Sequence, residues 1–170
     1  MYLFLIGNIS PVIDCTYMKI SNVLNKHLII ANMTSRTKKG VLEELASQLA
    51  QCEARVNKEE LLKLLIEREK LGSSGILNGA AVPHCKLKNI DTLLVVFGRS
   101  RDGIDFGALD GNLSHFFFLV VTPEISIGSN LSILSCIAHL AQSESFRKHC
   151  MEAKSTDELY QVIKDEEQKF

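Results

Sequence analysis

Apolar side chains recur every three or four positions in several stretches of this chain, the spacing of a helix that buries one face. The clearest stretch runs from Lys38 to Gln51, with glutamate and glutamine side chains on the opposite side. A second helix is expected to open after Asn57, which forms a capping-box pattern with Glu60, and to end near Arg68. The inward positions of these two helices are expected to be Val41, Leu42, Leu45, Ala46, Leu49, Leu61, Leu62, Leu65 and Ile66.

Three more helices are expected towards the C-terminus. The first is an apolar segment from about Ser129 to Ala141, and the second covers Ser145 to Ala153. The third begins with Ser155 as its N-cap and Glu158 three residues later. Its inner face is expected to consist of Leu159, Val162 and Ile163.

Short apolar runs between the helical segments predict strands. Leu93 to Phe97 and Phe116 to Val121 are rich in β-branched and aromatic residues, as buried strands are. His27 to Ala31 is a shorter strand-like run, and a turn is expected from Gly98 to Asp110. Helices before and after a central group of strands predict an α/β fold, a small mixed β-sheet flanked by helices.

The composition narrows the class of protein. The chain has 170 residues, of which 46% are hydrophobic, and a net charge of −1. It suits one domain, and its charge gives no support for a nucleic-acid or membrane-surface partner. Five scattered cysteines without a Cys-x-x-Cys pair indicate a reducing cytosol. Residues 1–17 contain an apolar run too short to span a bilayer, so we expect a poorly ordered extension or an upstream start codon before a domain over residues 18–170.

The chemistry is concentrated between Arg68 and His84. Pro83 fixes its own backbone angle and biases Val82 to an extended conformation, so His84 should be held in a defined place. Glycines spaced through this stretch allow close backbone approach, and neighbouring hydroxyls and amides are donors suited to an anion. The residues expected to line an anion site in this way are Gly72, Ser73, Ser74, Gly75 and Val82.

The run REKxGSxGIxNGxAxPHxKL, from Arg68 to Leu87, resembles the phosphorylation-site signature of a known family. The family comprises the enzyme IIA components of the fructose–mannitol class in the bacterial phosphoenolpyruvate:sugar phosphotransferase system. The resemblance is strongest to its nitrogen-regulatory branch. It extends from about Met18 to the C-terminus and implies the enzyme IIA fold, with no metal or organic cofactor.

The resemblance implies roles for three residues. His84 would accept a phosphoryl group from the phosphocarrier HPr or a similar protein, and Arg68 would stabilise the added charge, because guanidinium offers paired donors to phosphate. The family has a second histidine where this chain has Asn130. Asparagine can still donate a hydrogen bond to phosphate, but it cannot become a cation. A largely apolar docking surface with Ile76, Leu77 and Val82 is expected around His84.

Two functions fit these features. The chain could be a regulatory, nitrogen-type enzyme IIA whose phosphorylation state changes its affinity for a transporter, a kinase or another enzyme. Alternatively, it could be a free-standing fructose- or mannitol-type enzyme IIA that feeds a separate IIB/IIC transporter. A third reading, an interaction protein that has lost phosphotransfer, rests on Asn130 alone.

Other candidate residues have simpler interpretations. Cys85 beside His84 suggests a Cys/His nucleophile or metal site, but no cluster of further ligands has suitable spacing. His115 is expected to be a strand-end residue. The carboxylates expected to be solvated near a turn are Asp102, Asp105 and Asp110.

Overall fold

The computed structural model describes residues 18–126 and 129–170, without the side chains of Ser129 and Asn130; the expected extension over residues 1–17 lies outside these described residues. Helices come before and after a central group of strands, as the sequence pattern predicts in outline. In chain order they are α1 (Ile20–Val23), η2 (Lys26–Leu28), β1 (Ile29–Ile30), α2 (Lys38–Cys52), α3 (Lys58–Lys70), β2 (Ala80–Ala81), β3 (His84–Leu87), β4 (Leu94–Ile104), β5 (Ser114–Pro123), α4 (Ser129–Gln142), α5 (Glu144–Glu152) and α6 (Thr156–Glu167).

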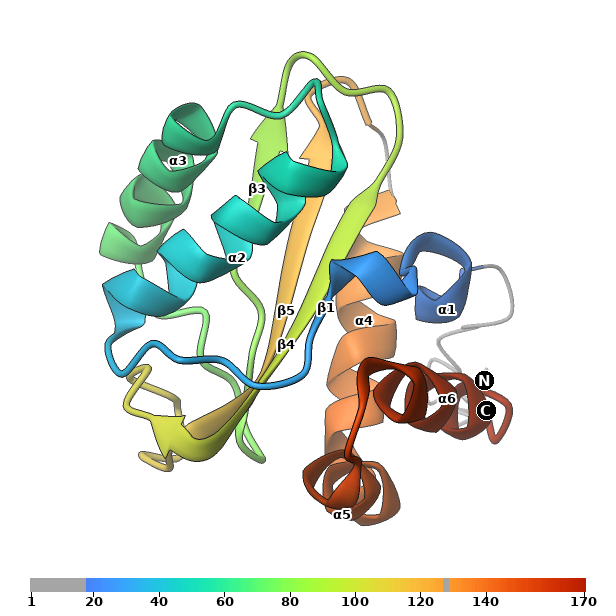
Figure 1. Cartoon of the computed structure of the whole chain (residues 1–170). Coiled ribbons are helices and arrows are strands. Elements are labelled where there is room, and N and C mark those ends of the chain that lie inside the picture. Colours follow the sequence, from blue (N-terminus) through green and yellow to red (C-terminus); the bar gives the residue numbers. More distant parts are fainter. Residues whose placement is uncertain (1–17, 127–128) are drawn as a thin grey trace, which may run out of the picture.

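The molecule has three layers. A five-stranded sheet lies between α2 and α3 on one face and α4, α5, α6 and α1 on the other (Figure 1). Strand order is β1-β4-β5-β2, with β3 also pairing with β5; β4 and β5 are antiparallel, and the other pairs are parallel. The predicted mixed sheet flanked by helices is therefore confirmed. No helix among the described residues is long and apolar enough to cross a membrane.

Strands β2 and β3 pair with the same side of β5 in one continuous register. Ala81 is opposite Phe117, and His84 is opposite Val120, three residues further along each chain. They therefore form one strand that is interrupted at Val82 and Pro83. Proline has no N–H to donate to a sheet ladder, so an interruption at this position is expected chemically.

The helix starts follow local side-chain chemistry. The Asn57 side chain accepts a hydrogen bond from the Glu60 N–H, and the Ser155 hydroxyl does the same for Glu158, which confirms both predicted N-caps. The predicted inner face of α2 is completely buried, but in α3 only Leu61 and Leu65 are. Helix α5 starts earlier than predicted, because Ser143 caps it.

Two strand predictions were wrong in extent. The pattern ends one strand at Phe97, whereas β4 continues to Ile104 through a register shift after Arg99. Of the predicted strand from His27 to Ala31, only β1 forms, because the preceding residues make a 3-10 turn. Two more strands, β2 and β3, were not predicted.

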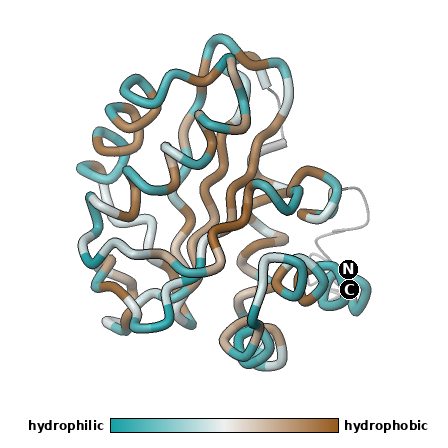
Figure 2. The backbone as a smooth tube through the Cα atoms, in the orientation of Figure 1, coloured by the Kyte–Doolittle hydropathy of each residue, from teal (hydrophilic) through white to brown (hydrophobic). Residues whose placement is uncertain are grey.

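Apolar strands form the centre of the core. The hydropathy of the chain is highest along the sheet, and the polar positions lie on the outer faces of the helices (Figure 2). Phe97 on β4 and Phe118 on β5 pack with ring centroids 4.8 Å apart, and both are fully buried. Gly98 is needed beside them, since a Cβ there would come within 2.6 Å of the Met33 sulfur. The same Cβ would lie 3.3 Å from Leu45 Cδ2 of α2, so helix α2 packs closely on the sheet at this position.

A buried arginine explains why β4 is longer than its apolar run. Arg99 has no exposed surface, and its guanidinium donates to the carbonyls of Cys150 (2.7 Å) and Ala153 (2.6 Å) at the end of α5. Its Nε donates to the Ala31 carbonyl at 2.8 Å. Burial lowers the pKa of Arg99, and the positive charge of Arg101 adds to this effect. The carbonyl end of a helix carries partial negative charge, which favours a cation there.

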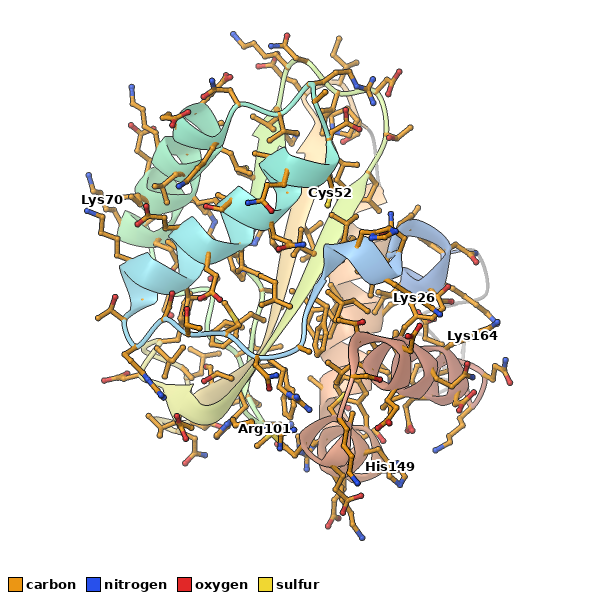
Figure 3. The ribbon with its side chains drawn as sticks, in the orientation of Figure 1. Lys26, Cys52, Lys70, Arg101, His149 and Lys164 are labelled. Carbon is orange, nitrogen blue, oxygen red and sulfur yellow. The ribbon has the colours of Figure 1, made fainter. Side chains whose placement is uncertain are left out.

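Arg101 reaches the same helix end from a different position. Its side chain is exposed and donates to the carbonyls of Met151 at 3.2 Å and Ala153 at 3.0 Å (Figure 3). Arg99 and Arg101 together thus attach the C-terminal end of α5 to β4. Both residues donate to the Ala153 carbonyl but differ in burial. They therefore form a matched pair for measuring how much burial contributes to the stability of the fold.

We expect Arg99→Met to lower the free energy of unfolding by about 2–4 kcal/mol, because buried carbonyls would lose their donors. Arg101→Met should cost about 1 kcal/mol or less, since water can replace an exposed donor. Urea unfolding followed by circular dichroism measures both. Equal decreases in the free energy of unfolding in the two variants would contradict the role assigned to the buried guanidinium.

Candidate active site

His84 is the first residue of β3, at the outer edge of the sheet. The Val120 N–H donates to the Pro83 carbonyl at 2.9 Å, so the Pro83 carbonyl faces β5. Neighbouring carbonyls of a strand point to opposite sides. The Val82 carbonyl therefore faces away from β5, where no strand of the described residues pairs with it.

The free carbonyl of Val82 fixes the tautomer of His84. His84 Nδ1 lies 2.8 Å from the Val82 carbonyl oxygen. A carbonyl can only accept, so Nδ1 carries the hydrogen and donates it. Nε2 of the neutral ring then keeps its lone pair. His84 is half-buried, and this nitrogen is the candidate nucleophile.

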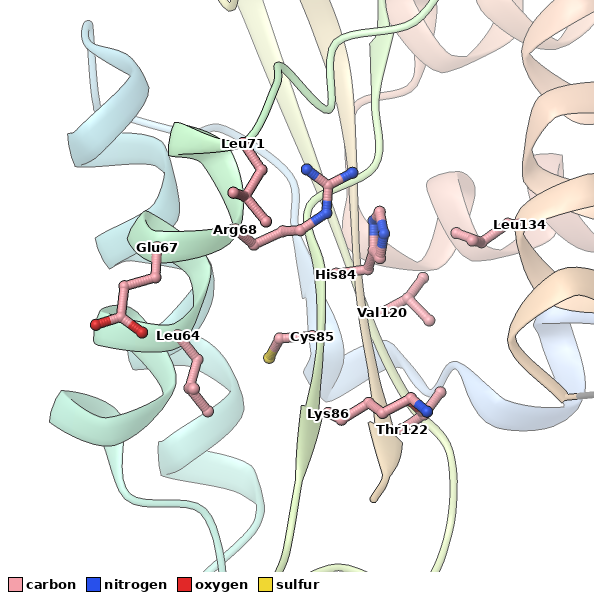
Figure 4. A pocket seen from close by; sticks show the side chains of 10 residues that line it. All are labelled: Leu64, Glu67, Arg68, Leu71, His84, Cys85, Lys86, Val120, Thr122 and Leu134. Atoms are coloured by element: carbon pink, nitrogen blue, oxygen red, sulfur yellow. The ribbon is translucent and has the colours of Figure 1, made fainter. Parts of the chain in front are cut away.

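His84 lies in an open pocket of about 660 Å³ that extends around the edge strand (Figure 4). Most of its wall is apolar, contributed by α3, β5 and α4. The charged groups come from the end of α3 and from β3. The lining residues are Leu64, Glu67, Arg68, Leu71, His84, Cys85, Lys86, Val120, Thr122 and Leu134.

Arg68 is in the last turn of α3 and extends towards the imidazole of His84 (Figure 4). Its Nη1 donates to the Gly72 carbonyl at 3.1 Å, which uses one of five N–H donors. No carboxylate among the described residues forms an ion pair with it. The guanidinium is therefore not held in an ion pair, although the Glu67 side chain also lines the pocket with His84.

The residues expected to line an anion site are not in this pocket. Ser73 Oγ donates to the Phe106 carbonyl at 2.6 Å and accepts from the Gly75 N–H at 3.0 Å. The Ser74 N–H and hydroxyl both donate to the carboxylate of Glu69. These donors are already used within the protein.

The remaining loop residues shape the backbone. Gly75 allows a close approach, since a Cβ there would lie 2.8 Å from the Ala108 Cα. Gly72 supplies the carbonyl that accepts from Arg68. Val82 contributes through its carbonyl, which orients His84, and not through a contact with the pocket.

Cys85 does not form a reactive pair with His84. Burial raises the pKa of the Cys85 thiol to about 12, so the thiolate is scarce at neutral pH. Adjacent strand residues also point to opposite faces, which separates the two side chains (Figure 4). Among the described residues, no group of three or more His, Cys, Asp or Glu side chains could hold a metal ion.

Strand alternation brings Lys86, which was not predicted as a site residue, into the site. His84 and Lys86 are two residues apart on β3 and therefore share one face, opposite Val120 and Thr122 of β5. Lys86 is exposed and has no ion-pair partner among the described residues. The Thr122 hydroxyl is buried without a hydrogen-bond partner in the described chain. If β3 had been predicted, the alternation of side chains along a strand would have indicated that Lys86 shares a face with His84.

Asn130 is in the first turn of α4, four residues before Leu134, and its side chain lies outside the described residues. Leu134 lines the pocket. Helix α4 follows β5 and returns alongside it (Figure 1). Asn130 is therefore about one helical turn closer to the start of α4 than the wall residue Leu134.

His115 lies in β5, away from this pocket. Its Nδ1 is 2.9 Å from the Ser100 carbonyl, as expected for a structural residue of the strand. The carboxylates of the 98–110 region are also structural. Asp102 pairs with Arg36 on the surface, and Asp110 accepts from the Asn78 N–H at 3.1 Å.

Comparison with known proteins identifies the family. The sequence model described as "Phosphoenolpyruvate-dependent sugar phosphotransferase system, EIIA 2" matches residues 22–166. The chain is 33% identical over 146 residues to the fructose-specific EIIABC component of Bacillus subtilis, a match covering 86% of this chain but only 23% of that protein. It is 32% identical over 154 residues to the nitrogen regulatory protein of Escherichia coli, with 89% and 93% covered.

A solved structure supports the same assignment. The nitrogen regulatory protein IIA-Ntr of Neisseria meningitidis superimposes with a TM-score of 0.78 at 28% identity, over 85% of this chain and 98% of that one. The mannitol IIA of Escherichia coli shares the fold with a TM-score of 0.70 at 20% identity, over 82% and 98%. The chain belongs to the EIIA 2 family of the phosphoenolpyruvate-dependent sugar phosphotransferase system.

Proposed function

We propose that this protein is a phosphoryl carrier that accepts a phosphoryl group on Nε2 of His84 from an HPr-like phosphocarrier. The observation that carries the proposal is the 2.8 Å contact between His84 Nδ1 and the Val82 carbonyl, which leaves the Nε2 lone pair free. That lone pair forms the new N–P bond while the N–P bond of the donor phosphohistidine breaks. The electron pair of the broken bond returns to the donor's nitrogen, so no cofactor or redox partner is needed.

Charge compensation is the main task of the protein in such a transfer. The phosphoryl group brings about two negative charges, and Arg68 supplies a guanidinium in the same pocket that has no ion-pair partner in the described part of the chain. Two unit charges roughly 4 Å apart near a protein surface attract by about 4 kcal/mol. Lys86, on the same strand face as His84, adds a second cation.

The rim of the pocket is suited to docking of the phosphoryl donor. Leu71, which lines the pocket, is 86% exposed at the end of α3, and Leu131, three residues before the lining residue Leu134 on α4, is 76% exposed. Exposed leucines on α4 and at the end of α3, the two helices that supply Leu134 and Leu64 to the pocket wall, can exclude water from the transferring group when a partner docks. Of the residues expected in this role, Val82 is buried, and neither Ile76 nor Leu77 lines the pocket.

The fate of the phosphoryl group separates two roles within this function. A nitrogen-type regulatory role is the first candidate, because the nitrogen regulatory protein of Escherichia coli matches along 93% of its length. A sugar-specific role is the second, because the fructose-specific relative is at least as similar over the shared region. Transfer to a purified IIB domain supports transport, and its absence supports regulation through a transporter or kinase. Either role places the protein in the cytoplasm.

We predict that His84 is the phosphoryl acceptor. Incubation with phosphoenolpyruvate, enzyme I and HPr should add one phosphate, labile in acid and stable in base, to the parent protein, and none to His84→Ala. Intact-protein mass spectrometry measures this. His115→Gln is the matched control, since His115 has the same tautomer outside the pocket. Equal labelling of His84→Ala and the parent would reject the assignment.

Arg68→Ala should slow phosphorylation of His84 by about tenfold to a hundredfold. The reason is the loss of a charge-assisted hydrogen bond of roughly 1.5–3 kcal/mol in the transition state. Lys63→Ala removes an exposed charge of the same sign from the same helix and should leave the rate unchanged. Rapid-quench kinetics with phosphorylated HPr compare the two variants. If Arg68→Ala is phosphorylated as fast as the parent protein, Arg68 is only a charge at the helix end and does not act in the transfer.

Asn130→His should speed the same reaction by about tenfold. A histidine at this position can become a cation and compensate phosphate charge, whereas an asparagine offers only a neutral donor. The start of α4 also favours an anion through its free N–H groups. The rate of transfer from phosphorylated HPr is the measurement. A rate equal to or below that of the parent would place Asn130 outside the transfer site.

A further inference from the structure

The contact that fixes the His84 tautomer depends on the position of one backbone unit. The Val82 carbonyl accepts from His84 Nδ1, and the Val82 N–H donates to the Ser74 carbonyl at 2.9 Å. On its other side, the Pro83 carbonyl accepts from the Val120 N–H at 2.9 Å. The peptide that orients the imidazole is therefore held between β5 and the loop at Ser74.

Ser74 is in turn held by the carboxylate of Glu69, next to the bridge that pairs Gly75 with Ala81. Its N–H lies 3.1 and 3.2 Å from the two carboxylate oxygens of Glu69, and its hydroxyl donates to the same group. Ser74 is only 5% exposed. Hydrogen bonds to an ionised acceptor are about twice as strong as neutral ones, so this attachment is stronger than an ordinary loop contact.

The charge of Glu69 is compensated within the protein. Its side chain is 7% exposed, and Lys38 Nζ lies 2.6 Å from Oε2. Lys38 also donates to the Phe106 carbonyl at 3.1 Å and lies 4.7 Å from the centre of the Phe106 ring. A buried carboxylate needs a partner of this kind to stay ionised.

Glu69 directly follows Arg68 at the end of α3. Arg68 faces the pocket, whereas Glu69, roughly 100° further around the helix, contacts Lys38 and the loop at Ser74. A single helical turn therefore carries both the cation beside the imidazole and the anchor of the segment that orients it. Movement of this turn would change both together.

We propose that Glu69 is a positioning residue for phosphoryl transfer, acting through Ser74 and the Val82 carbonyl to hold His84 with Nε2 unprotonated. The proposal rests on phosphoryl transfer at His84. Without the Glu69 carboxylate, Ser74 loses its anchor, the Val82 peptide moves, and the hydrogen bond to Nδ1 weakens. The imidazole then populates the tautomer with the hydrogen on Nε2, which has no lone pair there for attack on phosphorus.

The test measures the tautomer separately from the reaction. Long-range ¹H–¹⁵N correlation spectra of the full chain at about pH 8.5, above the ordinary titration range of imidazole, distinguish the two neutral forms of His84. We expect the Nδ1–H form in the parent and a mixture in Glu69→Ala. The kcat/KM for transfer from phosphorylated HPr should fall by up to about a hundredfold, mostly in kcat, as expected for a misplaced reacting group.

Three further variants separate positioning from general stability. Glu69→Gln keeps an acceptor for the Ser74 N–H, so it should restore most of the Nδ1–H form. Ser74→Ala keeps the backbone bond and removes only the hydroxyl, so it should give a smaller shift and serves if Glu69→Ala does not fold. Glu59→Ala is the matched control, because Glu59 is an exposed residue of the same helix whose side chain makes no hydrogen bond or ion pair in the described chain.

The outcomes are distinguishable. If the Glu69 and Ser74 variants have the parental tautomer, or if transfer slows in Glu69→Ala without a change of tautomer, the positioning role is wrong. If the parent protein is never phosphorylated, the proposed function fails. The tautomer spectra would still show in that case whether Glu69 controls the ring of His84.

Discussion

The site depends on the pairing along one side of β5, the side that faces away from β4. This side pairs with β2 and β3 as one interrupted strand, and the interruption falls at Val82 and Pro83. Because β3 is an edge, the Val82 carbonyl has no strand partner and accepts from His84 instead. An unpaired edge is usually a liability in a sheet. In this protein, the carbonyl left free at the edge sets which nitrogen of a histidine carries its proton.

The opposite half of the molecule keeps the other wall of the pocket in place. Leu134 comes from α4, and α5 continues directly from α4 and ends on the guanidiniums of Arg99 and Arg101. A buried cation without a carboxylate partner is costly unless carbonyl dipoles surround it. The helix end provides these dipoles, so the C-terminal helices are attached to β4 at a defined place.

Local chemistry predicted much of the fold but only part of the site. The N-caps at Asn57 and Ser155 depend on residues three positions away, so the sequence was sufficient for them. Strands β2 and β3 are short and are defined by their pairing with β5, which no local pattern indicates. His84 and Arg68 were found through a family signature. That signature could not show that the Ser74 donors are used by Glu69, because the choice between a ligand and an internal carboxylate is made by tertiary contacts.

The shared register of β2 and β3 limits how this region can change in length. Ala81 and His84 pair with residues of β5 that are also three positions apart, so the number of residues between them is fixed by the sheet. Inserting or deleting one residue there would turn His84 to the face that Cys85 now occupies. A substitution at Val82 changes one side chain and leaves the register of the strand intact. An insertion or deletion of one residue shifts that register. Natural and engineered relatives with a working histidine should therefore vary in this segment by composition and not by length.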